Sequence, residues 1–208
     1  RIRRGLAPFL KLGLHTPPEA ERCLDNLTLC NDLEDACRGA QVVVEAAPED
    51  LGLKQELLAR AQAAAEADAL LCSNSSALSV TGMARGLERP ERLVGAHFWN
   101  PAPVIPCVEI VRGEKTSDRS VDETWALVAA AGKEPVLVRR EVPGFLGNRL
   151  QHALQREALY LVEQGIASPE DVDRVVKYGF GLRYALMGPL ERADLGGLDV
   201  TYAVQQTV

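Results

Sequence analysis

The sequence has few of the features that mark membrane or nucleic-acid-binding proteins. No run of apolar residues approaches the ~20 needed to cross a bilayer, so we expect a soluble protein without a membrane segment. Neither charge sign dominates, because 23 basic and 29 acidic residues leave a net charge of -6, which gives no reason to expect nucleic acid as a partner. Aromatic residues are scarce at 5%, whereas hydrophobic residues make up 47%, enough for a sizeable core.

Cysteines are present but never in the Cys-x-x-Cys spacing. Their number is odd, which argues against a complete disulfide framework, and no secretory signal pattern opens the chain. We therefore expect a reducing, cytoplasmic setting, and we predict no metal site. The five residues are Cys23, Cys30, Cys37, Cys72 and Cys107.

Short strands and helices alternate over the first two thirds of the chain. Apolar and β-branched runs predict strands at 27–30, 41–47, 69–74, 92–99, 104–111 and 134–140. Amphipathic stretches predict helices at 1–14, 32–39, 49–67 and 120–132. Asp32 is placed to cap the second of these helices. The alternation predicts an α/β fold with a mostly parallel sheet.

The pattern changes after residue 142, and no further strand is predicted. The remaining residues predict helices at 144–165, 168–181 and 188–208. Gly165 is placed to end the first of these, and Ser168 and Pro169 are placed to begin the second. The chain is therefore predicted to divide into an α/β domain, 1–142, and an all-helical domain, 143–208.

Polar side chains gather where the predicted strands end, and open α/β sheets bind their ligands at the carboxyl ends of the strands. Asn148 follows the domain boundary, so its helix could face the same cleft. Each residue alone has a structural explanation, because a serine run is usually a helix cap and Asn148 would be an ordinary helix residue. The strand-end residues are Glu45, Glu49, Asn74, Ser75, Ser76, His97 and Asn100.

A histidine and a glutamate stand in the otherwise apolar strands of "GAHFWNPAPVIPCVEIV", Gly95 to Val111. Burying an unpaired polar group costs about 1–3 kcal/mol or more, so a buried imidazole or carboxylate needs a partner. His97 could be a satisfied core residue, and Glu109 could face solvent on an edge strand. Otherwise the two side chains satisfy each other, or they lie at the edge of a site that supplies their partners.

Three stretches of the sequence together resemble the L-3-hydroxyacyl-CoA dehydrogenase family, including its lambda-crystallin (gulonate dehydrogenase) and carnitine dehydrogenase branches. They are "SNSSAL", "GAHFWNPAPVIPCVEIV" and "VPGFLGNRL". Ser76 precedes His97 by 21 residues and Glu109 follows it by 12, and both intervals agree with the family pattern. The resemblance implies a Rossmann-like sheet, a smaller helical domain and a homodimer.

The sequence departs from the family pattern in a few places. Ser75 stands where the family has threonine, Trp99 where phenylalanine is usual, and Glu141 where aspartate is common. No Gly-x-Gly-x-x-Gly occurs, although the family carries this phosphate-binding turn in an N-terminal βαβ unit, which we expect ahead of Arg1. The family's helical domain also normally continues beyond the point where this sequence stops.

The resemblance implies a catalytic role for four residues. His97 is similar to the family's catalytic base, and Glu109 to the carboxylate that orients it. Ser76 and Asn148 are similar to the residues that hold the reacting substrate oxygen. The residue types suit the chemistry, because imidazole changes charge near neutral pH and a nearby carboxylate stabilises imidazolium and fixes the tautomer. We therefore predict that His97 and Glu109 pair at the cleft.

The same resemblance implies that the cofactor is NAD. Glu49 and Lys54, in "APEDLGLK", match family positions that contact the nicotinamide cofactor. Ser76 and Asn100 are assigned to the same cofactor site. The choice of NAD over NADP stays open, because the acidic residue expected near the end of the second strand is not in this sequence.

The predicted function is NAD-dependent oxidation of the 3-hydroxyl of an acyl-CoA, or reduction of the 3-keto form. An alternative rests on "GFGLRYALMGPLE", where Arg183 and Tyr184 resemble the gulonate and carnitine branches. Arg183 would then bind the carboxylate of a small free 3-hydroxy acid, unless it pairs with an acid such as Glu191. The remaining alternatives are a crystallin-like structural protein and an assembly module without activity.

Overall fold

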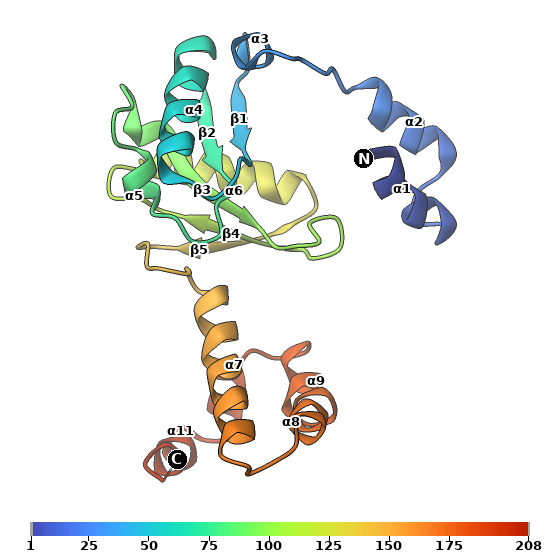
Figure 1. The fold of residues 1–208 in the computed structure, drawn as a ribbon, viewed down its shortest axis with the longest axis vertical. Helices are drawn as coiled ribbons and strands as arrows, with labels where there is room; N and C mark the ends of the chain where they lie inside the picture. Colours follow the sequence, from blue (N-terminus) through green and yellow to red (C-terminus); the bar gives the residue numbers. More distant parts are fainter. Residues whose placement is uncertain (1, 208) are drawn as a thin grey trace. The chain divides into compact units, whose positions relative to one another are not determined.

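The computed structural model describes residues 2–207, which fall into two compact units, 1–146 and 147–208. The first unit is a sheet flanked by helices, and the second contains helices alone (Figure 1). The first unit ends at Leu146, and the second begins at Gly147. No helix among residues 2–207 combines the length and apolar character needed to cross a membrane.

The first unit is built on a five-stranded sheet in the order β1-β2-β3-β4-β5, which confirms the predicted α/β fold. Neighbouring strands run parallel except β3 and β4, which are antiparallel. The short loop 99–106 explains this reversal, because a parallel connection needs a crossover of a dozen or more residues. The strands are β1 (Val42–Glu45), β2 (Leu70–Ser73), β3 (Leu93–Phe98), β4 (Cys107–Val111) and β5 (Glu134–Val138).

Several helices of this unit begin where a side chain caps them. In four cases a side-chain oxygen accepts a hydrogen bond from the third backbone N–H of the helix, which satisfies one of the free donors there. The capping residues are Asp32, as predicted, and Asp50, Ser79 and Ser117. The helices are α1 (Ile2–Lys11), α2 (Pro17–Asp25), α3 (Leu33–Cys37), α4 (Leu51–Ala64), α5 (Val80–Met83) and α6 (Asp118–Ala130), with a 3-10 turn at Pro90–Arg92.

The strand predicted over 27–30 is wrong. These residues form an irregular segment between α2 and α3, outside the sheet. The side chain of Leu29 is 92% exposed, so it contributes nothing to a core. An apolar run becomes a strand only where a neighbouring strand takes up its backbone hydrogen bonds, and no strand of residues 2–207 pairs with this segment.

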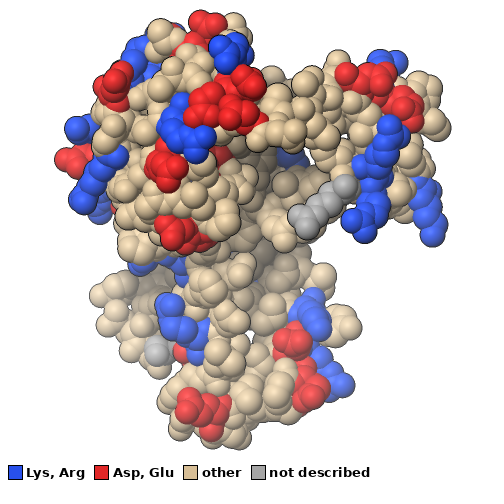
Figure 2. Space-filling model, turned by 45° about the horizontal axis from the view of Figure 1, so that its top comes forward, with Lys and Arg blue, Asp and Glu red and all other residues tan. Residues whose placement is uncertain are grey.

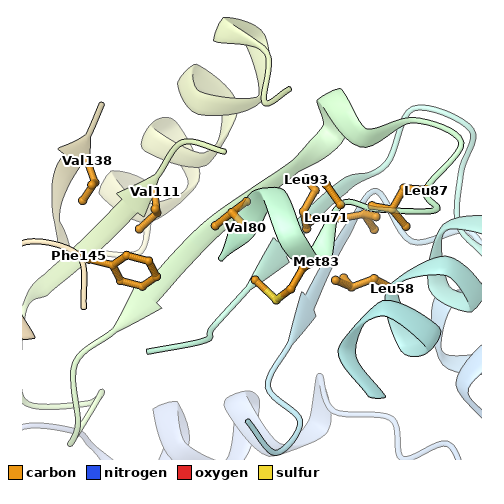
Figure 3. Close-up of a cluster of buried hydrophobic side chains, with 10 residues drawn as sticks. Leu58, Leu71, Val80, Met83, Leu87, Leu93, Val111, Val138 and Phe145 are labelled. Atoms are coloured by element: carbon orange, nitrogen blue, oxygen red, sulfur yellow. The ribbon is translucent and has the colours of Figure 1, made fainter. Parts of the chain in front are cut away.

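Two hydrophobic clusters cover the two faces of the sheet. On one face, Leu58 of α4 and Val80 and Met83 of α5 pack onto the strands, together with Phe145 from the segment after β5 (Figure 3). On the other face, Val121 of α6 packs onto buried residues of β2, β3 and β4. Strands β2, β3 and β4 are therefore buried on both faces, as parallel strands usually are, whereas the edge strand β1 exposes Val42 and Val44.

Gly95 of β3 packs closely against Val111 of β4 and Val80 of α5. A Cβ at this position would lie 2.8 Å from Val111 Cβ and 3.0 Å from Val80 Cγ2. We expect Gly95→Ala to lower the free energy of unfolding of the whole protein by about 1–3 kcal/mol, because the neighbours must move apart. In the control Gly5→Ala, the new methyl group meets nothing within 4 Å. Urea unfolding measures both variants, and a Gly95→Ala midpoint equal to wild type would contradict this packing.

The second unit contains helices only, as predicted. Gly165 follows α7 with a left-handed φ of 66°, and Ser168 caps α8 by accepting the Asp171 N–H at 3.1 Å; both were expected. The helices are α7 (Gly147–Glu163), α8 (Pro169–Val175), α9 (Gly181–Tyr184), α10 (Pro189–Leu195) and α11 (Leu198–Gln205), with a wide π-type turn at Val176–Phe180.

The predicted extent of these helices is wrong at three places, each of them at a glycine. The first helix begins later than predicted, because Gly144 and Phe145 have left-handed φ values of 77° and 49°. The second is interrupted at Gly179, whose φ of -103° and ψ of -114° are not helical. The last is divided by Gly197, whose φ is 90°. A left-handed or extended residue cannot continue a right-handed helix.

Candidate active site at the carboxyl edge of the sheet

The antiparallel register of β3 and β4 places His97 directly opposite Glu109. Residues paired in this way point to the same face of the sheet and lie within side-chain reach. His97 Nδ1 is 2.8 Å from Glu109 Oε2, and the two residues are only 6% and 2% exposed. The pairing predicted from the sequence is confirmed, and each buried group has the partner that its burial requires.

The Glu109 carboxylate accepts hydrogen bonds from two further donors. Trp99 Nε1 lies 3.2 Å from Oε2, and the backbone N–H of Leu146 donates to Oε1 at 2.9 Å. Hydrogen bonds of this kind favour the ionised carboxylate and fix its orientation. Sequence reasoning noted Trp99 only as a departure from the family pattern, and it had no signal for Leu146.

The imidazole of His97 is in contact with two aromatic rings. The ring centroids of Trp99 and Phe145 lie 5.7 and 5.8 Å from that of His97. Because Nδ1 faces a carboxylate, it carries the ring proton in the neutral imidazole, which leaves the lone pair on Nε2. An imidazole held in this tautomer can accept a proton from a ligand through Nε2.

The turn after β2 ties the ends of three strands together. Asn74 donates its N–H to the Glu45 carbonyl at 2.8 Å, and its Oδ1 accepts the Phe98 N–H at 2.9 Å. Ser75 Oγ accepts the Leu78 N–H at 2.9 Å, which closes the turn. The carboxyl ends of β1, β2 and β3 therefore form one polar edge, as predicted from the sequence.

Glu49 holds this serine turn from the side of β1. Its Oε2 accepts a hydrogen bond from Ser75 Oγ at 2.8 Å, and its Oε1 accepts one from the Ser76 N–H at 2.6 Å. The Glu49 side chain is about half exposed, and Ser76 is exposed. Glu49 thus positions the backbone of Ser76, which sequence reasoning did not anticipate.

A buried ion pair lies behind Glu49. Lys54 Nζ is 2.7 Å from Glu45 Oε1, 2.8 Å from the Ala47 carbonyl and 3.8 Å from Glu49 Oε2, and Lys54 is 1% exposed. The second oxygen of Glu45 accepts a hydrogen bond from Ser73 Oγ at 2.6 Å. Both charges are therefore satisfied, as a buried pair requires. The only sequence signal was a lysine near the start of a helix that follows a strand ending in glutamate.

The four residues predicted to bind the cofactor occupy two layers of this edge. Three of them are exposed to solvent: Glu49, Ser76 and Asn100. Lys54 is buried, and its Nζ lies 3.8 Å from Oε2 of the exposed Glu49. Exposed carboxylate, hydroxyl and amide groups at the carboxyl ends of parallel strands fit the polar carboxamide of a nicotinamide. A glycine-rich turn for the pyrophosphate is not part of this sequence. The contacts with NAD stay a prediction.

The other two predicted residues belong to the helical unit. Asn148 lies in the first turn of α7 and is half-buried. Arg183 lies on α9 and is exposed. Glu191, the acid considered as an alternative partner of Arg183, accepts the Gly188 N–H at 2.6 Å and thereby caps α10, and no ion pair joins it to Arg183 within residues 2–207.

Cavity size alone does not locate the site. A cavity of 620 Å³ lies at the opposite, amino-terminal edge of the sheet, where it is lined by Gln41, Leu70 and Arg92 among others. A smaller one of 280 Å³ is lined in part by Glu141 and Phe145.

Within the described chain, no three His, Cys, Asp or Glu side chains group closely enough to hold a metal ion. Acidic and basic side chains are interspersed over the visible surface (Figure 2).

Removing one partner of the buried ion pair should destabilise the protein strongly. We expect Glu45→Gln to lower the free energy of unfolding by about 3 kcal/mol, because Lys54 would keep a buried charge without its partner. Replacing both residues, as Glu45→Leu with Lys54→Met, should recover much of this loss. Urea unfolding is the measurement, and Glu34→Gln, which removes an exposed partner of Arg60, is the control. Equal losses for Glu45→Gln and Glu34→Gln would contradict the expectation.

The chain matches one family over nearly its whole length. Residues 1–142 match the NAD binding domain of 3-hydroxyacyl-CoA dehydrogenase, and residues 144–208 match the C-terminal domain of the same enzyme. An L-carnitine dehydrogenase of Streptomyces griseus is 44% identical over 201 residues, and a lambda-crystallin homolog of Bos taurus is 42% identical over 176 residues. The structure of 3-hydroxybutyryl-CoA dehydrogenase from Escherichia coli is similar, with a TM-score of 0.81 and 36% identity.

The chain spans little more than half the length of these curated relatives. The match to the carnitine dehydrogenase covers 95% of this chain and 59% of the relative, and the match to the lambda-crystallin homolog covers 85% and 55%. The Escherichia coli structure is matched over 98% of this chain and 42% of its own. The strand-edge residues and the first helices of the second unit both lie within the matched part.

Proposed function

Because the chain belongs to the 3-hydroxyacyl-CoA dehydrogenase family, we propose that the whole protein is an NAD-dependent dehydrogenase that oxidises the 3-hydroxyl of an acyl-CoA or reduces the 3-keto form. The observation that supports this proposal is the buried His97–Glu109 pair on β3 and β4. It lies next to β2, which is followed by the turn that contains Ser76. Bound NAD would accept the hydride that leaves the carbon carrying the 3-hydroxyl.

Each residue of the site has one task in this reaction. His97 Nε2 takes the proton of the 3-hydroxyl, and Glu109 stabilises the imidazolium that results. Ser76 and Asn148 donate hydrogen bonds to the reacting oxygen, which gains negative charge as the proton leaves. Glu49 supports this task through its hydrogen bond to the Ser76 N–H.

Replacing the base should remove most of the turnover. His97→Gln is expected to lower kcat by about 10²–10⁴-fold, because the amide cannot take the hydroxyl proton. The control His15→Gln changes an exposed histidine outside the sheet and should leave kcat unaltered. The absorbance of reduced nicotinamide, followed with 3-hydroxybutyryl-CoA and NAD, measures the rate. Near-normal turnover in His97→Gln would exclude this residue as the base.

A small free 3-hydroxy acid is a second candidate substrate. Arg183 is exposed and, within residues 2–207, forms no ion pair with Glu191, so its guanidinium is available for bidentate binding of a carboxylate. L-carnitine, the substrate in the name of the 44% identical relative, is such an acid. The thioester remains the first choice, because "SNSS" and "AHFWNP" resemble the acyl-CoA branch more closely.

A substitution at Arg183 separates the two substrate classes. If Arg183 binds a substrate carboxylate, Arg183→Met should raise the KM for free 3-hydroxy acids about 10-fold or more and leave kcat nearly unchanged, because a charge-assisted bidentate contact is lost. Arg174→Met, on the neighbouring helix α8, is the control. Turnover of 3-hydroxybutyryl-CoA with no response to either substitution, and no turnover of free acids, would rule out the carboxylate role.

We also infer that the whole protein forms a homodimer through the helical unit. Helix α7 has no buried residue, and it exposes Leu150, Leu159 and Tyr160 at 65%, 64% and 52%. A second copy of the unit would cover this apolar surface. A crystallin-like structural role is less well supported, because such a role does not call for a buried His–Glu pair at a polar strand edge.

A further inference from the structure

Trp99 donates its indole N–H to the oxygen that also accepts the His97 N–H. Trp99 Nε1 lies 3.2 Å from Glu109 Oε2, and His97 Nδ1 lies 2.8 Å from the same atom. The two rings are also close, with centroids 5.7 Å apart and an angle of 40° between their planes. Phenylalanine, the usual residue of the family at this position, has no donor for such a bond.

We propose that Trp99 is a positioning residue that tunes the base through Glu109, an inference that rests on the proposed function. A carboxylate oxygen that accepts two hydrogen bonds offers less of its negative charge to each donor. The indole N–H therefore competes with the His97 N–H for the charge of Glu109 Oε2. The indole also holds Oε2 in place, so the Nδ1–H bond keeps Nε2 in one direction.

Other titratable groups lie on the elements around the His97–Glu109 pair. Lys133 Nζ donates hydrogen bonds to the carbonyls of Ala102, at 2.5 Å, and of Ile105, at 3.1 Å. Burial, and then the charges of Glu109 and Glu134, raise the pKa of the Cys107 thiol, so this group stays neutral near pH 7. Titratable groups on the neighbouring elements include Cys72 on β2, Cys107 on β4, Glu45 at the end of β1, Glu49 and Lys54 beyond β1, and Lys133 and Glu134 at the start of β5.

The indole N–H itself provides a test that does not depend on activity. The chain has two tryptophans, so the ¹⁵N spectrum of the whole protein contains an indole signal for Trp99 and one for Trp125, and Trp99→Phe identifies the first. Glu109→Gln should shift the Trp99 signal and speed its exchange with solvent, because a neutral amide is a weaker acceptor. The Trp125 signal should stay where it is. A Trp99 signal indifferent to Glu109→Gln would overturn the proposal.

Kinetics test the effect on the base. Trp99→Phe keeps an aromatic ring but removes the donor that holds Glu109 Oε2 in place. Because Nε2 of His97 is then less well directed at the substrate hydroxyl, kcat should fall about 3- to 30-fold with little change in KM. The acidic limb of the kcat/KM profile for alcohol oxidation should move up by about 0.5–1 pH unit, because the released carboxylate favours imidazolium. Glu109→Gln should move the same limb down, because the neutral glutamine amide does not favour imidazolium. The matched control Trp125→Phe, at a half-exposed position on α6, should do neither.

The outcomes separate this inference from the proposed function. Opposite displacements of the limb in Trp99→Phe and Glu109→Gln support the positioning role, whereas a wild-type limb in Trp99→Phe overturns it even if stability has changed. If the wild-type protein turns over no 3-hydroxy substrate, the proposed function fails. The indole signal then still decides for or against the Trp99–Glu109 hydrogen bond.

Discussion

The direction of a single strand, β4, decides the geometry of the site. Because β4 runs antiparallel to β3, Glu109 lies directly opposite His97, and a 2.8 Å hydrogen bond joins the two side chains. The tight return through residues 99–106 keeps Trp99 within reach of the same carboxylate. A parallel β4 would need a crossover longer than the loop 99–106, so this short loop could not then place Glu109 opposite His97. Every proposed step at the base depends on this reversal.

The neighbouring strands supply the rest of the site through a second polar network. The buried Lys54 donates a hydrogen bond to Glu45, and Glu45 also accepts one from Ser73 Oγ. These buried contacts join the ends of β1 and β2. Glu49 extends this network outward to the backbone of Ser76. The proposed base on β3 and the serine turn after β2 are also joined directly, because Asn74 Oδ1 accepts the Phe98 N–H at 2.9 Å. Contacts of this kind hold groups on different strands in a fixed relation.

The proposed tasks of two carboxylates at this edge differ because their surroundings differ. Glu109 is buried, and its donors include a histidine, a tryptophan and a backbone N–H. Glu49 is about half exposed, and its donors are the hydroxyl of Ser75 and the N–H of Ser76. The first environment suits a group that stabilises a cation next to it, and the second suits a group that shapes a turn open to a ligand. Residue type alone does not distinguish these tasks.

The sequence by itself determined the alternation of strands and helices, the caps at Asp32 and Ser168, and the partnership of His97 with Glu109, because these follow from local periodicity, local hydrogen bonds and the need of a buried polar group for a partner. Only the tertiary structure decided that residues 27–30 form no strand and that Lys54 is a buried partner of Glu45. It also decided that Trp99 donates to Glu109. These outcomes depend on which segments lie side by side, and a strand edge, an ion pair or a shared acceptor exists only once the chain has brought its distant parts together.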